Sequence, residues 1–114
     1  MKRHRLTNRY ETTRQGVKIG GRTLYVDVAR DSDGSVRSVF IDTYKTGTEQ
    51  RALIEVIARL ISLGLQYDVP LDKVVKLMRG TKFKPAGVVV GDPDIHFASS
   101  PLDFIAKHLE DACE

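Results

Sequence analysis

The sequence is poor in the residues that form disulfides or bind transition metals through sulfur. Cys113 is its only cysteine, so neither an intrachain disulfide nor a cysteine-based zinc site can form. Tryptophan is absent. The longest apolar run, residues 60–65, is far shorter than the roughly 20 residues of a membrane-spanning helix, and the basic first residues lack the apolar core of a secretion signal. These absences predict a cytoplasmic protein with no membrane segment, no bound metal and no cofactor.

Positive charge is concentrated at the start of the chain. Residues 1–22 contain seven Lys or Arg against Glu11 alone, whereas the remaining residues contain 11 basic and 14 acidic side chains. We expect residues 1–8 to form a flexible basic leader and residues 9–114 to form a single domain. The leader and its neighbours either bind polyanions or only keep the protein soluble. The residues of this polyanion arm are Lys2, Arg3, Arg5, Arg9 and Arg14.

Residues 10–42 have the pattern of three antiparallel strands. Strands are predicted over residues 10–19, 22–29 and 35–42, because β-branched and alternating apolar residues are separated by two tight turns. Gly20 and Gly21 form the first turn, since both positions can adopt positive φ. The second turn, residues 31–34, starts like a calcium-binding loop but lacks the later oxygen ligands, so a plain turn is predicted.

The second half is predicted to be mainly helical. A central core helix begins at residues 46–48 and weakens or ends at Gly64, and its broad apolar surface is expected to pack on the sheet. This surface is formed by Leu53, Ile54, Val56, Ile57, Leu60, Ile61 and Leu63. A second helix is predicted to begin with Pro70 at its first helical position and to close at Arg79-Gly80, and a third starts at residues 100–103, where Ser100 and Asp103 have capping spacing. With short extended pieces over residues 81–97, the predicted class is α+β, a three-stranded antiparallel meander packed on a long helix.

Several segments, in this order, resemble one known domain. They are residues 20–26, 33–34, 39–42, 45–47, 60–72, 83–87 and 98–103. Together they are similar to the C-terminal domain of adenosylcobalamin-dependent (class II) ribonucleotide reductases, the TSCPD domain, over residues 9–109. In that family the catalytic cysteines and the cobalamin contacts lie in a separate barrel domain that this sequence lacks. The resemblance therefore implies no catalytic residue here, and a reductase label taken from the family would not describe this chain.

The resemblance also suggests where a ligand could bind. Many short relatives carry cysteines at the positions of Thr48, Phe83 and Ser100, and the replacement of all three implies that any such metal site is lost. If these positions converge, two helix N-termini and neighbouring lysines would form an anion or nucleotide site. The candidate residues are Lys45, Thr46, Gly47, Thr48, Lys82, Lys84, Ser99 and Ser100. The alternative is two ordinary capped helices with solvated lysines.

Three functional hypotheses follow. The preferred one is a non-catalytic accessory or regulatory module of deoxynucleotide metabolism, with a ribonucleotide reductase subunit as partner. The second is a stand-alone nucleotide-binding or nucleotide-sequestering protein, such as a phage could encode. The third is weak nucleic-acid binding by the basic arm, with base stacking on Tyr10, Tyr25, Phe40 and Tyr44. A homo-oligomer is also expected, because a three-stranded sheet leaves exposed edges.

Overall fold

The computed structural model describes residue 3, residues 10–43 and residues 48–112. The chain divides into two compact units, which are described one at a time. Unit 1 comprises residues 1–15 and 25–70, and unit 2 comprises residues 16–24 and 71–114. Strands and helices occur in both units, so the predicted α+β class is confirmed.

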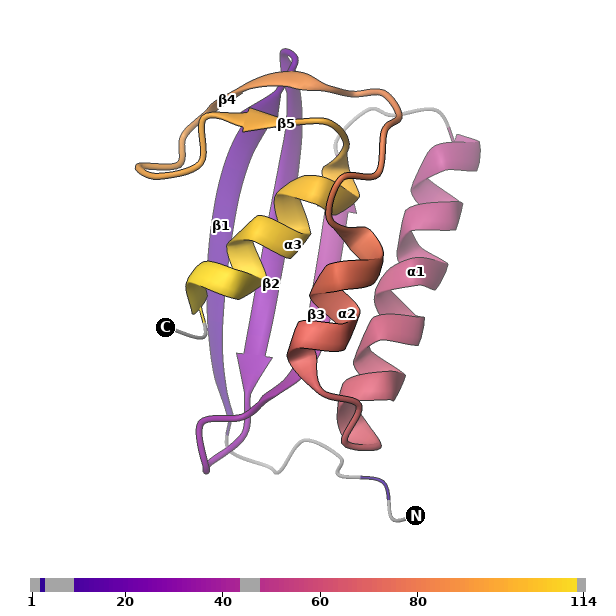
Figure 1. Ribbon diagram of the computed structural model, residues 1–114, viewed down its shortest axis with the longest axis vertical. Coiled ribbons are helices and arrows are strands. Elements are labelled where there is room, and N and C mark those ends of the chain that lie inside the picture. Colours follow the sequence, from indigo (N-terminus) through magenta and orange to yellow (C-terminus); the bar gives the residue numbers. More distant parts are fainter. Residues whose placement is uncertain (1–2, 4–9, 44–47, 113–114) are drawn as a thin grey trace. The chain divides into compact units, whose positions relative to one another are not determined.

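The predicted meander is present and is part of a larger sheet. Its strands are β1 (Glu11–Ile19), β2 (Arg22–Arg30) and β3 (Val36–Thr43). Gly20 and Gly21 join the first two with φ of 55° and 84°, as a hairpin turn between right-twisted strands requires. Two short strands from the extended region, β4 (Gly87–Val90) and β5 (Phe97–Ala98), complete a five-stranded sheet in the order β3-β2-β1-β4-β5 (Figure 1). The pairing of β4 with β1 was not predicted.

In unit 1, helix α1 (Thr48–Gln66) runs alongside β3 (Figure 1). Ile54, Ala58, Ile61 and Leu65, spaced by four, three and four residues, are buried as one helical stripe should be. The prediction that all the apolar residues of α1 are core was wrong. Leu53, Val56, Leu60 and Leu63 are exposed, at 63%, 49%, 63% and 41%. The physical reason is that a helix contacts one sheet with one face only.

Helix α1 ends two residues beyond Gly64, so the predicted end was slightly early. Asp68 adopts φ of 65°, the left-handed conformation that stops a helix. The N–H of Val69 donates to the Gly64 carbonyl at 3.0 Å, and the N–H of Asp68 donates to the Leu65 carbonyl at 3.3 Å. These two bonds, to carbonyls five and three residues earlier, define a Schellman motif at the C-terminal end of α1.

Side chains of α1 form hydrogen bonds with backbone groups on the outer edge of β3. Ser62 Oγ accepts from the Val39 N–H at 2.9 Å and donates to the Val39 carbonyl at 3.1 Å. One helical turn later, Gln66 Nε2 donates to the Arg37 carbonyl at 3.2 Å. Because β3 is the first strand of the sheet, these contacts occupy backbone groups that would otherwise be open to another strand. The exposed-edge argument for oligomerisation therefore does not apply at this part of β3.

In unit 2, α2 (Leu71–Met78) packs on α3 (Pro101–Ala112). Val74, Val75 and Met78 are the buried residues of α2, whereas Leu71, its first residue, is half-buried. Gly80, with φ of 83°, follows α2, and Pro101 is the first residue of α3, which confirms the predicted helix boundaries at both places. The core of this unit contains Phe104, Ile105 and Leu109, each at 0% exposure.

A buried arginine joins three segments of unit 1. Arg37, on β3, is 8% exposed. Its Nη1 donates to the Leu65 carbonyl at 3.1 Å and to Asp68 Oδ1 at 3.2 Å, at the C-terminal end of α1. Its other nitrogens lie 3.9 Å from Asp31 and 3.8 Å from Asp33, in the turn between β2 and β3. A cation at this place also interacts favourably with the helix dipole.

We expect Arg37→Ala to lower the free energy of unfolding by about 2–4 kcal/mol, because it removes a charge-assisted bond to the buried Leu65 carbonyl and separates three carboxylates from their cation. Urea denaturation measures the change. Arg51→Ala is the control, since Arg51 is 55% exposed in its ion pairs and should change the same quantity by less than about 0.5 kcal/mol. Equal midpoints for the two variants would contradict the role assigned to Arg37.

Candidate functional site

The predicted anion site is divided between the two units. Thr48, the first residue of α1, belongs to unit 1, whereas Lys82, Lys84, Ser99 and Ser100 belong to unit 2. Lys45, Thr46 and Gly47 lie outside the described residues. The convergence of Thr48 with Ser100 is therefore still a prediction. The site residues of unit 2 are described below by themselves.

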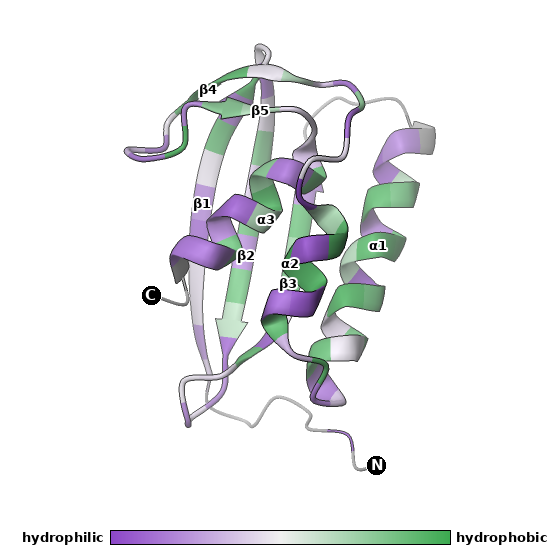
Figure 2. Cartoon of the chain, in the orientation of Figure 1, coloured by the Kyte–Doolittle hydropathy of each residue, from purple (hydrophilic) through white to green (hydrophobic). Residues whose placement is uncertain are grey.

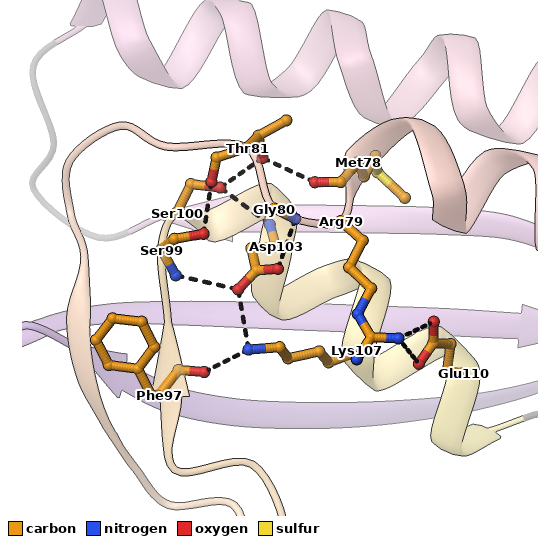
Figure 3. A network of polar contacts seen from close by, with 10 residues as sticks. All are labelled: Met78, Arg79, Gly80, Thr81, Phe97, Ser99, Ser100, Asp103, Lys107 and Glu110. Carbon is orange, nitrogen blue, oxygen red and sulfur yellow. Dashed lines mark hydrogen bonds and ion pairs between the residues drawn. The ribbon is translucent and has the colours of Figure 1, made fainter.

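The two serines before α3 use their hydroxyl groups within unit 2 (Figure 3). Ser99 Oγ donates to the Thr81 carbonyl at 2.7 Å. Ser100, at 0% exposure, accepts from the Asp103 N–H at 3.0 Å and shares a hydrogen bond of 2.7 Å with Thr81 Oγ1. Ser100 is thus the predicted N-cap of α3, and its buried hydroxyl has no open side toward a ligand.

Asp103 completes the capping and connects α3 to the loop after α2. Its two carboxylate oxygens accept from the N–H of Gly80 at 2.9 Å and from the N–H of Ser99 at 3.0 Å. Lys107 Nζ lies 3.1 Å from the same carboxylate. Burial alone raises the pKa of Asp103, but the two N–H donors and the Lys107 ammonium together outweigh it and hold that pKa below its usual value. The sequence indicated the cap, and it had no signal for the contact with Gly80, 23 positions away.

Lys82 and Lys84 are exposed on the loop that runs beside the start of α3. The loop is held there by the N–H of Phe83, which donates to the Ser99 carbonyl at 3.2 Å. The structure therefore brings Lys82, Lys84, Ser99 and Ser100 into one region of unit 2. Since Asp103 already places a negative charge at the α3 N-terminus and both serine hydroxyls are hydrogen-bonded within unit 2, the serine hydroxyls are not suited to bind an anion there.

Each unit also has a surface cleft that the sequence did not indicate. The cleft of unit 1, about 660 Å³, lies between β3 and α1, and its lining includes Phe40, Arg59 and Arg3. The cleft of unit 2 is about 310 Å³ and is lined in part by His96, Phe97 and Lys107. The larger volume falls within the range of small-molecule sites, and its aromatic ring and two guanidinium groups suit a planar anionic ligand.

Two residues of the predicted polyanion arm are described, and both have partners inside unit 1. Arg3 Nε donates to Gln66 Oε1 at 2.7 Å. Arg14 pairs with Asp27 at 3.2 Å and lies over the Tyr25 ring, 4.4 Å from its centroid. Lys2, Arg5, Arg9 and Tyr44 lie outside the described residues. Binding of nucleic acid by the arm stays a prediction, for which Arg3 and Arg14 would have to leave these contacts.

Residues 31–34 form the predicted turn. The N–H of Asp31 donates to the Ser35 carbonyl at 2.8 Å, and Gly34 has φ of 86°. Across residue 3 and residues 10–43 and 48–112, no three His, Cys, Asp or Glu side chains are grouped so that they could hold a metal ion. Within the same ranges, no helix has both the length and the apolar character needed to cross a membrane.

We expect the Asp103 network to make unit 2 acid-sensitive. Because the pKa of Asp103 is lowered in the folded state, its contribution is complete above the ordinary carboxyl pKa of about 3.9 and is lost as the pH falls through the lower, folded value. Asp103→Ala should destabilise the protein by about 1–3 kcal/mol at pH 7. Thermal melts between pH 2 and pH 7 measure both effects.

Two matched variants test the origin of that acid sensitivity. Asp103→Asn keeps an acceptor oxygen but cannot ionise, so its melting temperature should fall less steeply below pH 4 than that of the natural sequence. Asp111→Asn removes an exposed carboxylate of the same helix and should leave the acid dependence unchanged. Parallel curves for all three proteins would show that Asp103 is not the titrating group.

Comparison with known proteins identifies relatives that share nearly all of this chain. The vitamin B12-dependent ribonucleotide reductase of Agrobacterium fabrum is 40% identical over 107 residues, which are 94% of this chain and 8% of that protein. The enzymes of the same name from Bradyrhizobium diazoefficiens and Rhodopirellula baltica are 37% and 30% identical, over 94% and 95% of this chain. This chain thus spans 8–10% of the length of these three relatives. No solved structure matches it significantly.

A family model agrees with these relatives and with the resemblance noted in the sequence. The model of the TSCPD domain matches residues 2–113. A match of this extent includes both units and every described helix and strand. The chain therefore belongs to the TSCPD domain family.

Proposed function

We propose that this chain is a non-catalytic accessory or regulatory module of deoxynucleotide metabolism, acting on or beside a ribonucleotide reductase. The observation that supports this most is the 40% identity, over nearly the whole chain, to a segment that makes up only 8% of a vitamin B12-dependent ribonucleotide reductase. With Cys113 as its only cysteine, the chain cannot supply the pair of reducing thiols that this chemistry needs. We therefore propose that the chain acts by binding to its partner, in the cytoplasm.

The test uses a reductase whose own matching segment has been removed. If the chain acts as this segment does, it should bind the shortened Agrobacterium fabrum enzyme and change its rate of deoxynucleotide formation at least about twofold. The intact enzyme is the control, because its own segment occupies the same place and should prevent both effects. Calorimetry at tens of micromolar that detects no binding to the shortened enzyme, together with unchanged rates, would contradict the proposal.

Nucleotide binding is a second candidate, and two observations favour it. Lys82 and Lys84 are exposed at the α3 end of unit 2, where the sequence predicted an anion site. The cleft of unit 1, about 660 Å³, combines Phe40 with Arg59 and Arg3. Stacking on an aromatic ring and charge-assisted bonds to phosphate are the two contacts that nucleotide recognition uses most.

A thermal-shift experiment with nucleoside triphosphates and cyclic nucleotides tests this candidate. A ligand at about 100 times its dissociation constant should stabilise the native state by about 2.7 kcal/mol and raise the melting temperature by several degrees. Lys45→Ala and Lys82→Ala should reduce the shift if the predicted anion site is used, and Arg59→Ala should reduce it if the unit 1 cleft is used. Lys73→Ala, an exposed lysine of α2, is the control. The absence of a shift with every nucleotide at millimolar concentration would exclude this function.

A further inference from the structure

We propose that the unit 1 cleft binds a nucleotide with the edge of its base on the backbone of Ile41 and its phosphate on Arg3 and Arg59. This inference rests on the nucleotide binding proposed above and adds how the base is held. The cleft lies between β3 and α1, and both Ile41 and Ala58 line it. At this place the series of hydrogen bonds from α1 to the edge of β3 is interrupted.

The side chains of α1 meet the edge of β3 at regular steps. Gln66 Nε2 donates to the Arg37 carbonyl at 3.2 Å, and Ser62 Oγ bonds to the N–H and the carbonyl of Val39 at 2.9 and 3.1 Å. Four residues of a helix cover about 6 Å, and two residues of a strand cover about 6.6–6.8 Å. The helix and the strand therefore run in opposite directions here and stay in step.

The next step of this series places Ala58 beside Ile41. Ala58 is four residues before Ser62, and Ile41 is two residues after Val39. Both residues are buried, at 5% and 8% exposure. Along α1, hydrophobic residues recur between hydrophilic ones (Figure 2), and the methyl group of Ala58 is neither a donor nor an acceptor. The α1 residue at this level therefore cannot bond to the backbone of Ile41.

The N–H and the carbonyl of Ile41 face the cleft. In an antiparallel strand, the backbone groups of alternate residues point toward and away from the same neighbouring strand. β3 is the end strand of the sheet, and the backbone groups of Arg37 and Val39 that bond to α1 point away from β2. Ile41 follows them by one more step of two residues, so its N–H and its carbonyl point in the same direction. A donor and an acceptor thus lie side by side in the wall of the cleft.

A nucleobase edge matches this pair of backbone groups. In adenine, for example, the exocyclic amino group is a donor and the adjacent ring nitrogen is an acceptor, so one base can bond to both groups of Ile41. Buried polar groups without a partner are unfavourable, which makes such a ligand a better occupant than an apolar one. Phe40, the preceding residue, lines the same cleft and offers its ring to the base.

The charges of the cleft suit the phosphate of the same ligand. Arg3 and Arg59 line the cleft together with one acidic residue, Glu55. The Glu55 carboxylate lies 3.8 Å from Arg51 Nε, so a second cation balances it. Arg3 Nε donates to Gln66 Oε1 at 2.7 Å, and this bond orients a guanidinium group that has further N–H donors for phosphate oxygens.

Amide hydrogen exchange of the natural sequence tests the state of Ile41 without any variant. The Val39 N–H, which is bonded to Ser62, should exchange slowly, and the Ile41 N–H should exchange at least about tenfold faster. A saturating nucleoside monophosphate should slow the exchange of the Ile41 N–H at least about tenfold, because the base then accepts from it. Equal protection of these two amides in the free protein would overturn the proposal.

Ala58→Ser tests the same contact by substitution. The new hydroxyl should bond to the backbone of Ile41 as Ser62 does to Val39, and so occupy the groups that the base needs. We expect this variant to bind nucleoside monophosphates at least about tenfold more weakly in calorimetry, and to protect the Ile41 amide without ligand. Ala52→Ser is the matched control, because it adds the same hydroxyl at an exposed position of α1 and should change neither quantity.

The ligand series separates this binding mode from nucleotide binding in general. It consists of adenosine, guanosine, cytidine and uridine monophosphates, and of ribose 5-phosphate, which lacks the base. Ribose 5-phosphate should bind at least about tenfold more weakly than the tightest of the four nucleotides. If it binds equally well, or if Ala58→Ser binds nucleotides as the natural sequence does, the binding mode is wrong and nucleotide binding stands. If none of the four binds at millimolar concentration, both proposals are wrong.

Discussion

The structure of unit 1 depends on one buried cation. Arg37 extends from β3 to the last turn of α1 and to the turn between β2 and β3, so one guanidinium group fixes the helix end, the strand and the turn together. The Schellman motif at Asp68 presents the Leu65 carbonyl and the Asp68 carboxylate to the same nitrogen. With this end fixed, Ser62 and Gln66 come into register with the edge of β3. A Lys at this position would offer a single ammonium group and could not serve all three segments.

The local rules of the sequence predicted most of the fold because they are satisfied within short segments. The Gly20-Gly21 hairpin, the strands on either side of it, the stop at Gly80 and the start of α3 at Ser100-Pro101 each depend on residues within a few positions of one another. The pairing of β4 with β1 could not be predicted, since Lys18 and Val90 are far apart in sequence and nothing in either segment encodes its partner. Asp68 was missed as the helix stop because a glycine stood nearby at position 64, and glycine is the residue most often found in the left-handed conformation.

The candidate site was predictable in part. Sequence spacing identified Ser100 and Asp103 as a helix cap, and the cap is present. What the sequence could not indicate is that the same hydroxyl and carboxylate also hold the loop after α2, through Thr81 and Gly80. Those contacts occupy the polar groups at the start of α3 within the protein, and the exposed lysines nearby, Lys82 and Lys84, belong to the adjacent loop. A capping motif and an anion site have the same sequence pattern, and only the hydrogen-bond partners distinguish them.

The outer edge of β3 and the outer face of α1 differ in how far they are covered. Backbone groups on the β3 edge would pair with almost any extended chain, and Ser62 and Gln66 occupy them. The outer face of α1, by contrast, keeps Leu53, Val56, Leu60 and Leu63 exposed. A single helix thus protects the sheet edge through the polar side chains of Ser62 and Gln66 and packs on β3 through Ile54, Ala58, Ile61 and Leu65, so edge protection and core packing come from neighbouring faces of α1.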